Sequence, residues 1–206
     1  MESQWLTLAK RLQAIASTGL HFSQDEFHRE RFAEVSDIAM CMLADLGRVP
    51  IERIHSLVSD SASGYSTPKV DVRGALIEDD RVLLVRERSD GLWTLPGGFA
   101  DVGRSAAENV AKEILEEAGV EVTVRHLYGL RHKAKQAYEP DARDFYKLFF
   151  LCERAGDREP TPGHDTSEAR FFPRSELPPL SRGRVIEQDI EAAFEFQLGG
   201  RMTTFD

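Results

Sequence analysis

The chain has 206 residues and a formal net charge of −9, with 41% hydrophobic and 30% charged residues, which predicts one domain of roughly 130 to 150 residues plus a smaller piece. It contains no apolar run near the length of about 20 residues that spans a bilayer, and its opening segment lacks a signal-peptide pattern. Because nucleic acids attract basic proteins, the acidic balance also argues against DNA binding, and we expect a soluble cytoplasmic protein.

Residues 1–66 are predicted to form a small helical domain. The face of its first helix is formed by recurring apolar residues, namely Trp5, Leu8, Leu12 and Ile15. Ser23 with Glu26 predicts a capping box for a second helix that ends at Gly47, and a third short helix begins near Pro50. The segment SDSASGYSTP has the composition of a linker, so we place the domain boundary near residue 66.

Residues 67–206 change to a strand pattern. The stretches VDVRGALI and RVLLV flank the polar turn EDD, which predicts a β-hairpin with a somewhat long loop. Three further stretches have strand composition, VEVTVRHLYGL, DFYKLFFLC and EARFFP, and RVIEQDIEAAFEFQL has helical periodicity. Strands with interspersed helices predict an α/β fold for this part of the chain.

One helix of this second part begins and ends with clear signals. Ser105 and Glu108 form a capping box at its start, and Gly119 is placed to end it. Its two faces differ, because a narrow apolar stripe lies on one side and a cluster of carboxylates on another. The stripe consists of Ala107, Val110, Ala111, Ile114 and Ala118, and the cluster of Glu113, Glu116 and Glu117.

The glutamate cluster has a cost that requires an explanation. Like charges at i,i+4 destabilise a helix by about 0.2 to 0.5 kcal/mol per pair, as for Glu113 and Glu117. A glutamate-rich face is usually just solvated, but we expect no cation within this patch, and a glycine-rich loop precedes the helix. Carboxylate oxygens are ligands for hard divalent cations such as Mg²⁺, whose other ligands can be substrate phosphates. The cluster therefore indicates a metal site for an anionic substrate.

The stretch from Gly98 to Val120 resembles the Nudix box, G-x5-E-x7-R-E-U-x-E-E-x-G-U, in which U is aliphatic. Seven of the nine specified positions agree, and two depart. Arg104 stands in place of an early glutamate, and Lys112 in place of an arginine, so that the positive charge is kept without the planar fork. Similarity extends over nearly the whole chain, for example in TPKVDVRGALI, WTLPGGFADVG and FFPRSELPPLS, and is greatest for the group that acts on nucleoside diphosphates linked to a second moiety.

This resemblance implies an α/β/α Nudix sandwich with a mixed sheet at residues 67–206, preceded by a helical N-terminal domain at residues 1–66. It implies hydrolysis of the diphosphate linkage of a nucleoside diphosphate-X, with a CDP-choline-like substrate or, alternatively, ADP-ribose. Mg²⁺ or Mn²⁺ would be held by Glu113, Glu116 and Glu117, and Lys112 would orient a glutamate. The base, the X group, the number of metal ions and the effect of Arg104 stay open.

Other site candidates are less specific. Gly97 and Gly98 lie in the glycine-rich loop, and Arg73 and Arg86 lie on strands from which they reach phosphates or simply face solvent. The general base is either a glutamate of the helix or Glu168, for which an exposed structural role is favoured. Base stacking is open to three aromatic residues, Tyr65, Trp93 and Phe99, although Trp93 is expected to pack under the loop. Lys147 is left undecided, and both cysteines are expected to be buried free thiols.

A different class is a Nudix-fold regulator that senses a ligand and binds DNA through its N-terminal helices. Residues 1–66 contain six Lys or Arg and nine Asp or Glu residues, which disfavours this role. The apolar faces of these helices suit dimerisation or substrate capping instead, and we expect a homodimer.

Overall fold

The computed structural model describes residues 2–58, 65–199 and 202–206. It divides into two compact units, one of Met1–Lys69 with Ala134–Phe145 and the other of Val70–Lys133 with Tyr146–Asp206. Most of the predicted linker, residues 59–64, lies outside the described residues. A search of the described helices finds none that is both long and apolar enough to cross a membrane.

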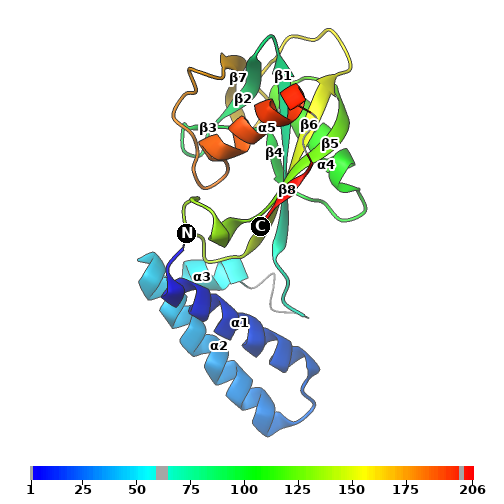
Figure 1. Cartoon of the computed structure of the whole chain (residues 1–206). Helices are drawn as coiled ribbons and strands as arrows, with labels where there is room; N and C mark the ends of the chain where they lie inside the picture. The colour runs from blue at the N-terminus through cyan, green and yellow to red at the C-terminus, as the bar shows by residue number, and fades with distance from the viewer. Residues whose placement is uncertain (1, 59–64, 200–201) are drawn as a thin grey trace. The chain divides into compact units, whose positions relative to one another are not determined.

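The helical unit contains α1 (Gln4–Phe22), α2 (Glu26–Gly47) and α3 (Ile51–Val58), with α1 and α2 side by side (Figure 1). The predicted cap of the second helix is wrong by two residues. Asp25 is the N-cap, because its side chain accepts a hydrogen bond of 2.9 Å from the backbone N–H of His28, whereas Ser23 ends α1. Aspartate and serine are both good caps, so composition alone did not distinguish them.

The large apolar residues that recur on one face of α1 are not the residues that are buried. Trp5 and Ile15 are 64% and 57% exposed, whereas small or polar residues are buried. The buried residues of α1 are Ala9, Gln13, Ala16 and Ser17. Small side chains let two helices approach closely, and the larger apolar residues are left uncovered on this chain. Cys41 on α2 is likewise exposed, contrary to the expected buried thiol, while Cys152 is buried.

The second unit is built on a sheet. Within the described residues eight strands form it, in the order β3-β2-β1-β6-β5-β8, with β4 on β1 and β7 on β2 (Figure 1). These strands are β1 (Lys69–Glu78), β2 (Arg81–Glu87), β3 (Trp93–Thr94), β4 (Gly97–Phe99), β5 (Val122–His132), β6 (Phe145–Arg154), β7 (Thr166–Pro173) and β8 (Thr204–Phe205). Strand β8 is parallel to β5, whereas β1 and β2 are antiparallel, so the sheet is mixed as predicted.

The predicted hairpin forms, but its loop is short. Ile77 pairs with Val82 and Glu78 with Arg81, so only Asp79 and Asp80 make the turn. Both have positive φ values, 50° and 58°, as a type I′ turn requires, and Asp is among the residues that tolerate this conformation. The prediction of a long loop was wrong because it counted Glu78 as part of the turn, although Glu78 belongs to β1.

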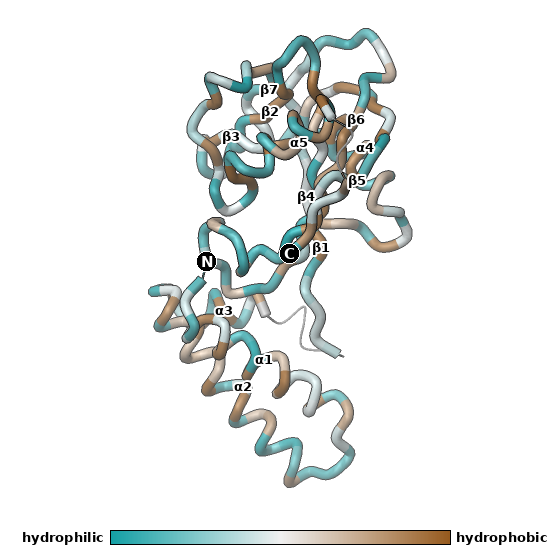
Figure 2. Tube along the Cα trace, viewed as in Figure 1, coloured by the Kyte–Doolittle hydropathy of each residue, from teal (hydrophilic) through white to brown (hydrophobic). Residues whose placement is uncertain are grey.

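Two helices cover the two faces of the sheet. Phe150 joins the core cluster that includes Ile114 of α4 (Ala106–Ala118), whereas its neighbour Phe149 contacts Tyr128, which in turn contacts Phe196 of α5 (Glu187–Gly199). Consecutive strand residues point to opposite faces, so α4 and α5 lie on opposite sides. Hydrophobic stretches, brown in Figure 2, run through the strands of the sheet. The predicted three-layer α/β/α arrangement is confirmed.

Candidate active site

Helix α4 begins and ends as the sequence predicts. The Ser105 side chain accepts from the backbone of Glu108, and the Glu108 carboxylate accepts from the backbone of Ser105 at 2.7 Å, which completes the capping box. Gly119 ends the helix in the left-handed conformation, with φ of 68°. The apolar face of α4 packs in the core, Glu113 and Glu117 are partly buried beside it, and Glu116 is exposed.

The predicted glycine-rich loop begins with strand β4 (Gly97–Phe99), and the two glycines of this segment lie directly against these glutamates. The backbone N–H of Gly97 donates to a carboxylate oxygen of Glu117 at 2.9 Å. Gly97 has φ of +146°, and a Cβ there would lie 2.0 Å from the carbonyl oxygen of Val72 on β1. A Cβ on Gly98 would lie 3.0 Å from a Glu113 oxygen. Glycine is therefore required for the close approach of this loop to both β1 and α4.

Lys112 supplies a cation to the cluster, which corrects the expectation that the patch has none. Its Nζ lies 3.1 Å from Glu116, 3.2 Å from Asp101 and 3.5 Å from Glu113. Hydrogen bonds to Glu116 and Asp101 raise the pKa of Lys112, so it stays protonated. The long side chain of Lys112 lets its ammonium group reach all three carboxylates.

Negative charge at the buried end of the cluster is incompletely balanced. Burial raises the pKa of Glu117 to about 7, and repulsion from Glu87 and Glu113 adds to this, while Arg73 and the Gly97 N–H oppose it. Burial also raises the pKa of Glu113, against the effect of Lys112. Such shifts are typical of sites where a group acts on charge or on protons.

Glu87 is a member of this site that the sequence reasoning missed. It is 8% exposed, and its charge acts on Glu117 and on Arg73. Alternation along RVLLVRE was the available signal, because it puts Glu87 on the same face as Leu83 and Val85, which pack in the core with α4.

A second missed feature fixes the C-terminal end of α4. The Thr166 hydroxyl donates to the backbone carbonyl of Glu117 at 2.7 Å and accepts from the N–H of Gly163 at 2.8 Å. Thr161 donates through its N–H to the carbonyl of Ala118 at 2.9 Å. These bonds satisfy carbonyl groups that a helix end leaves without partners. Their partners are about 50 residues away in sequence, so no local pattern predicts them.

The chemistry of the donors decides whether a divalent cation fits here. Among the described residues, no group of three or more His, Cys, Asp or Glu side chains is arranged around one point so that it could hold a metal ion. The donor type nevertheless fits Mg²⁺ or Mn²⁺, because Glu113, Glu116 and Glu117 offer carboxylate oxygens from one helix side. Burial, which disfavours the charged carboxylate, raises the pKa values of Glu113 and Glu117, and a bound cation would offset this effect.

The two arginine candidates differ in their surroundings. Arg73 is 5% exposed and is bonded to Asp71 and to the carbonyl of Leu95, so it does not face solvent. Arg86 is about half exposed, and it donates to Glu168 at 2.8 Å and to the carbonyl of Gly91 at 2.8 Å. A guanidinium that is buried and bonded on two sides suits positioning better than capture of an incoming phosphate.

The remaining candidates occupy different environments. Trp93 is 5% exposed and makes an edge contact with Phe172, which confirms the expected packing role. Phe99 and Tyr65 are 48% and 72% exposed. Lys147, which was undecided, is 2% exposed and bonded to Asp71.

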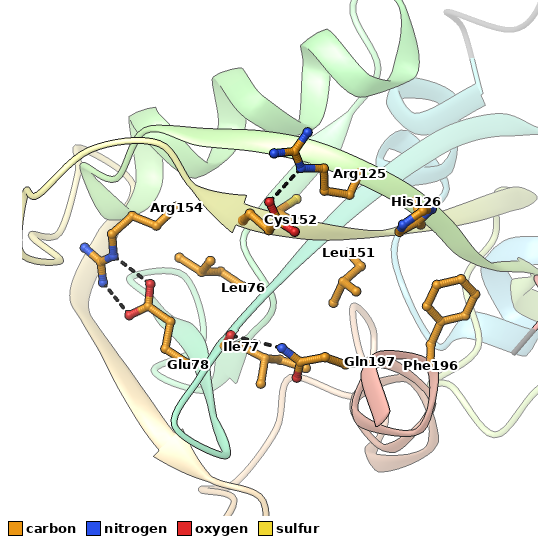
Figure 3. A pocket seen from close by; sticks show the side chains of 11 residues that line it. Leu76, Ile77, Glu78, Arg125, His126, Leu151, Cys152, Arg154, Phe196 and Gln197 are labelled. Atoms are coloured by element: carbon orange, nitrogen blue, oxygen red, sulfur yellow. Dashed lines mark hydrogen bonds and ion pairs between the residues drawn. The ribbon is translucent and has the colours of Figure 1, made fainter. Parts of the chain in front are cut away.

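A pocket of about 410 Å³ lies elsewhere in the same unit, between α5 and strands β1, β5 and β6 (Figure 3). It is lined by apolar side chains and by two closed ion pairs, Arg125 with Glu153 and Arg154 with Glu78, both at 2.7 Å. None of the predicted site residues lines this pocket.

Sequence profiles of two families match the chain. One is described as UDP-X-like, N-terminal oligomerisation domain, and covers residues 3–58, and the other is described as NUDIX domain and covers residues 68–193. YjhB of Bacillus subtilis (strain 168), provisionally named an ADP-ribose pyrophosphatase, is 41% identical over 196 residues, which are 95% of this chain and 93% of that protein.

Solved structures agree with these matches. An ADP-ribose pyrophosphatase from Streptococcus suis 89-1591 is 38% identical, with a TM-score of 0.61 over 68% of this chain and 100% of that chain. A UDP-X diphosphatase is 31% identical, with a TM-score of 0.64 over 98% of each chain. The second likeness therefore includes the helical N-terminal segment.

Proposed function

Since the chain belongs to the Nudix hydrolase family, we propose that it hydrolyses the diphosphate linkage of a nucleoside diphosphate-X with the help of Mg²⁺ or Mn²⁺. The products would be a nucleoside monophosphate and phospho-X. The observation that carries this proposal is the contact of the Gly97–Gly98 loop with Glu113 and Glu117, whose pKa values are raised by burial. It brings backbone N–H groups and metal-ligand oxygens to one place.

Glu113, Glu116 and Glu117 would hold the cation. When bound, a divalent ion neutralises diphosphate charge and lowers the pKa of a bound water. Lys112 holds Glu116 and Glu113 through its ammonium group, which keeps these side chains near each other on α4. We assign to Lys112 the positioning role of the missing arginine, with one donor group in place of a fork.

The substrate is expected to approach over the glycine loop. Gly98 is half-buried beside Glu113, so a diphosphate bound there can come close to the backbone, whereas Gly97 is buried against β1 and supports it from below. Arg86 is proposed as a phosphate contact, because its guanidinium is about half exposed. Its ion pair with Glu168 is also open to solvent. The proton acceptor is either a carboxylate of α4 or Glu168.

The relatives named above provide the substrate panel. ADP-ribose and UDP-sugars follow from the ADP-ribose pyrophosphatases and the UDP-X diphosphatase, and CDP-choline follows from the sequence analysis. We expect release of a nucleoside monophosphate from at least one of them with Mg²⁺ or Mn²⁺, and none with EDTA. Anion-exchange chromatography measures the products, and mass spectrometry of products formed in H₂¹⁸O identifies which phosphorus is attacked. Absence of metal-dependent product across the panel would contradict the proposal.

The regulator alternative predicts a different result. It requires salt-sensitive binding to duplex DNA, which a gel-shift titration measures. The net charge of −3 over residues 1–66 opposes such binding. We therefore propose no DNA partner, and the cytoplasmic location inferred from the sequence stays a prediction.

A further inference from the structure

Three buried charged side chains form a chain of contacts on β1 and β6. Asp71, Arg73 and Lys147 are 3%, 5% and 2% exposed. Asp71 accepts from Arg73 at 2.9 and 3.3 Å and also from the ammonium group of Lys147. Burying three charges is costly, and an apolar cluster of similar volume is often as stable. The sequence retains the charges in a place where packing alone does not require them.

The arginine of this cluster is bonded to the turn that leads to the glycine loop. Its Nη1 donates to the carbonyl of Leu95 at 3.2 Å. In the β1–β4 register Arg73 is the partner of Gly97, and the N–H of Gly74 donates to the carbonyl of Pro96 at 3.0 Å. The backbone of the Leu95–Gly97 turn is thus held at each of its residues, twice by β1 and once by Glu117.

The charge of the cluster also matches its surroundings. Two cations and one anion leave one positive charge, and the carboxylates that act on Arg73 besides Asp71 are Glu117 and Glu87. Arg73 therefore interacts with Asp71 inside the cluster and with the charges of Glu117 and Glu87 outside it. Replacing it with a neutral group would leave Glu117 with less compensation, whereas Glu87 would keep its ion pair with Arg184 at 3.3 Å.

We propose that Arg73, held by Asp71, which Lys147 also contacts, is a positioning residue that fixes the Leu95–Gly97 turn and, through the Gly97 N–H, the Glu117 carboxylate. This inference rests on the proposed hydrolase function for its kinetic consequence but not for its structural one. Groups that orient a metal ligand from behind typically change activity or metal affinity by about 10- to 100-fold when removed.

The test compares Arg73→Lys with Arg154→Lys. Lysine at position 73 keeps the charge and still reaches Asp71, but it lacks the second arm that reaches Leu95. Arg154 is a matched control, because it also joins β1 to β6 through a carboxylate, Glu78, at the other end of β1 (Figure 3). Amide hydrogen exchange at Gly97, measured by NMR on the protein alone, should become at least about 10-fold faster in R73K and stay unchanged in R154K.

Kinetics and Mn²⁺ titration complete the test. In R73K we expect kcat to fall at least about 10-fold with KM within about twofold, and weaker binding of Mn²⁺ alone by calorimetry. Lys147→Met should change the amide exchange rate of Gly97 and kcat in the same direction by a smaller factor.

A rise in KM with kcat unchanged would mean that Arg73 touches the substrate and is not a positioning residue. An unchanged exchange rate at Gly97 would also overturn the positioning role. An inactive wild type would contradict the hydrolase function alone, since exchange is measured without substrate.

Discussion

Glu117 combines three constraints in one side chain. It accepts the Gly97 N–H, it is repelled by Glu87 and Glu113, and burial disfavours its charge. A carboxylate under these constraints is poorly stabilised in the metal-free protein, and a cation would remove most of the penalty. The residue that costs stability is therefore the one proposed to bind the ion.

Substitution of Glu117 by Gln should lower kcat by at least about 100-fold without loss of the fold, because a ligand that stabilises the transition state is removed while the side-chain shape is kept. Steady-state kinetics at saturating Mg²⁺ measure the effect, and circular dichroism tests the fold. Turnover equal to that of the wild type would remove Glu117 from the metal site.

The same substitution should stabilise the metal-free protein at neutral pH. The folded pKa of Glu117, about 7, lies above its ordinary value of 4.5, so the folded state binds more protons between these values and stability is lost as pH rises through them. The full shift corresponds to about 3 kcal/mol, which solvent screening reduces to about 1 to 2 kcal/mol. In EDTA, urea unfolding should show E117Q above wild type at pH 8 and a difference that closes towards pH 5. A constant difference would contradict the assigned pKa.

Lys112 gives the third residue-scale prediction. Lys112→Met keeps much of the side-chain volume but removes the ammonium group that joins Asp101, Glu113 and Glu116. We expect kcat to fall about 10-fold and Lys112→Arg to retain or exceed wild-type activity, because the fork can engage two carboxylates at once. If K112M and K112R lose activity equally, the role depends on shape and not on charge.

At the scale of elements, α4 is fixed at both ends by different means. The capping box holds its start locally, while its end is held by residues 161–166 from a distant part of the chain. A Cβ on Gly163 would lie 1.7 Å from the carbonyl oxygen of Glu116, so this segment packs directly on the helix end. The orientation of the glutamates therefore depends on a contact far from them in sequence.

Gly163→Ala should displace this end of α4. We expect a loss of at least about 2 kcal/mol in unfolding free energy, since the clash is with backbone, and a fall in kcat that Mg²⁺ does not restore. Gly156→Ala is the control, because the Cβ there would lie 3.8 Å from the nearest atom, a Glu121 oxygen. Equal stability of the two variants in urea would contradict the packing role.

An element could be predicted from the sequence when the residues that fix it lie close together along the chain. Helix α4 was predicted from Ser105 to Gly119 because its caps and its buried stripe lie within one stretch. In α1 the recurring apolar residues did not show which face is buried, because close helix packing favours Ala9 and Ala16. Contacts such as Lys147 with Asp71 or Thr166 with Glu117 depend on strand register, which the sequence alone did not specify.

At the scale of the whole molecule, the helical unit has an uncovered apolar surface. Large side chains on α1 and α2 are more than half exposed, among them Trp5, Ile15, Phe27 and Ile38. Monomeric proteins rarely leave such residues gathered on one small unit. Together with the match to an N-terminal oligomerisation domain, this supports the proposed homodimer.

Introducing charge into this surface should separate the subunits. We expect light scattering to give about twice 23.2 kDa for the wild type and 23.2 kDa for the double variant Ile15→Glu, Ile38→Glu, because a buried unpaired carboxylate opposes association. Leu198→Glu is the control, since Leu198 is 76% exposed on α5 of the other unit. A wild type of monomer mass, or a double variant of dimer mass, would contradict the proposal.

The helical unit is completed by residues 134–145, which leave the sheet between β5 and β6. Ala142 packs on the cluster of Ala9, Met40, Leu43 and Ile54, and Asp144 pairs with Lys10 at 3.2 Å. During synthesis, the first three helices must therefore wait for more than eighty further residues before their last neighbours emerge from the ribosome. We infer that these helices stay partly unshielded on the nascent chain until residues 134–145 have been added.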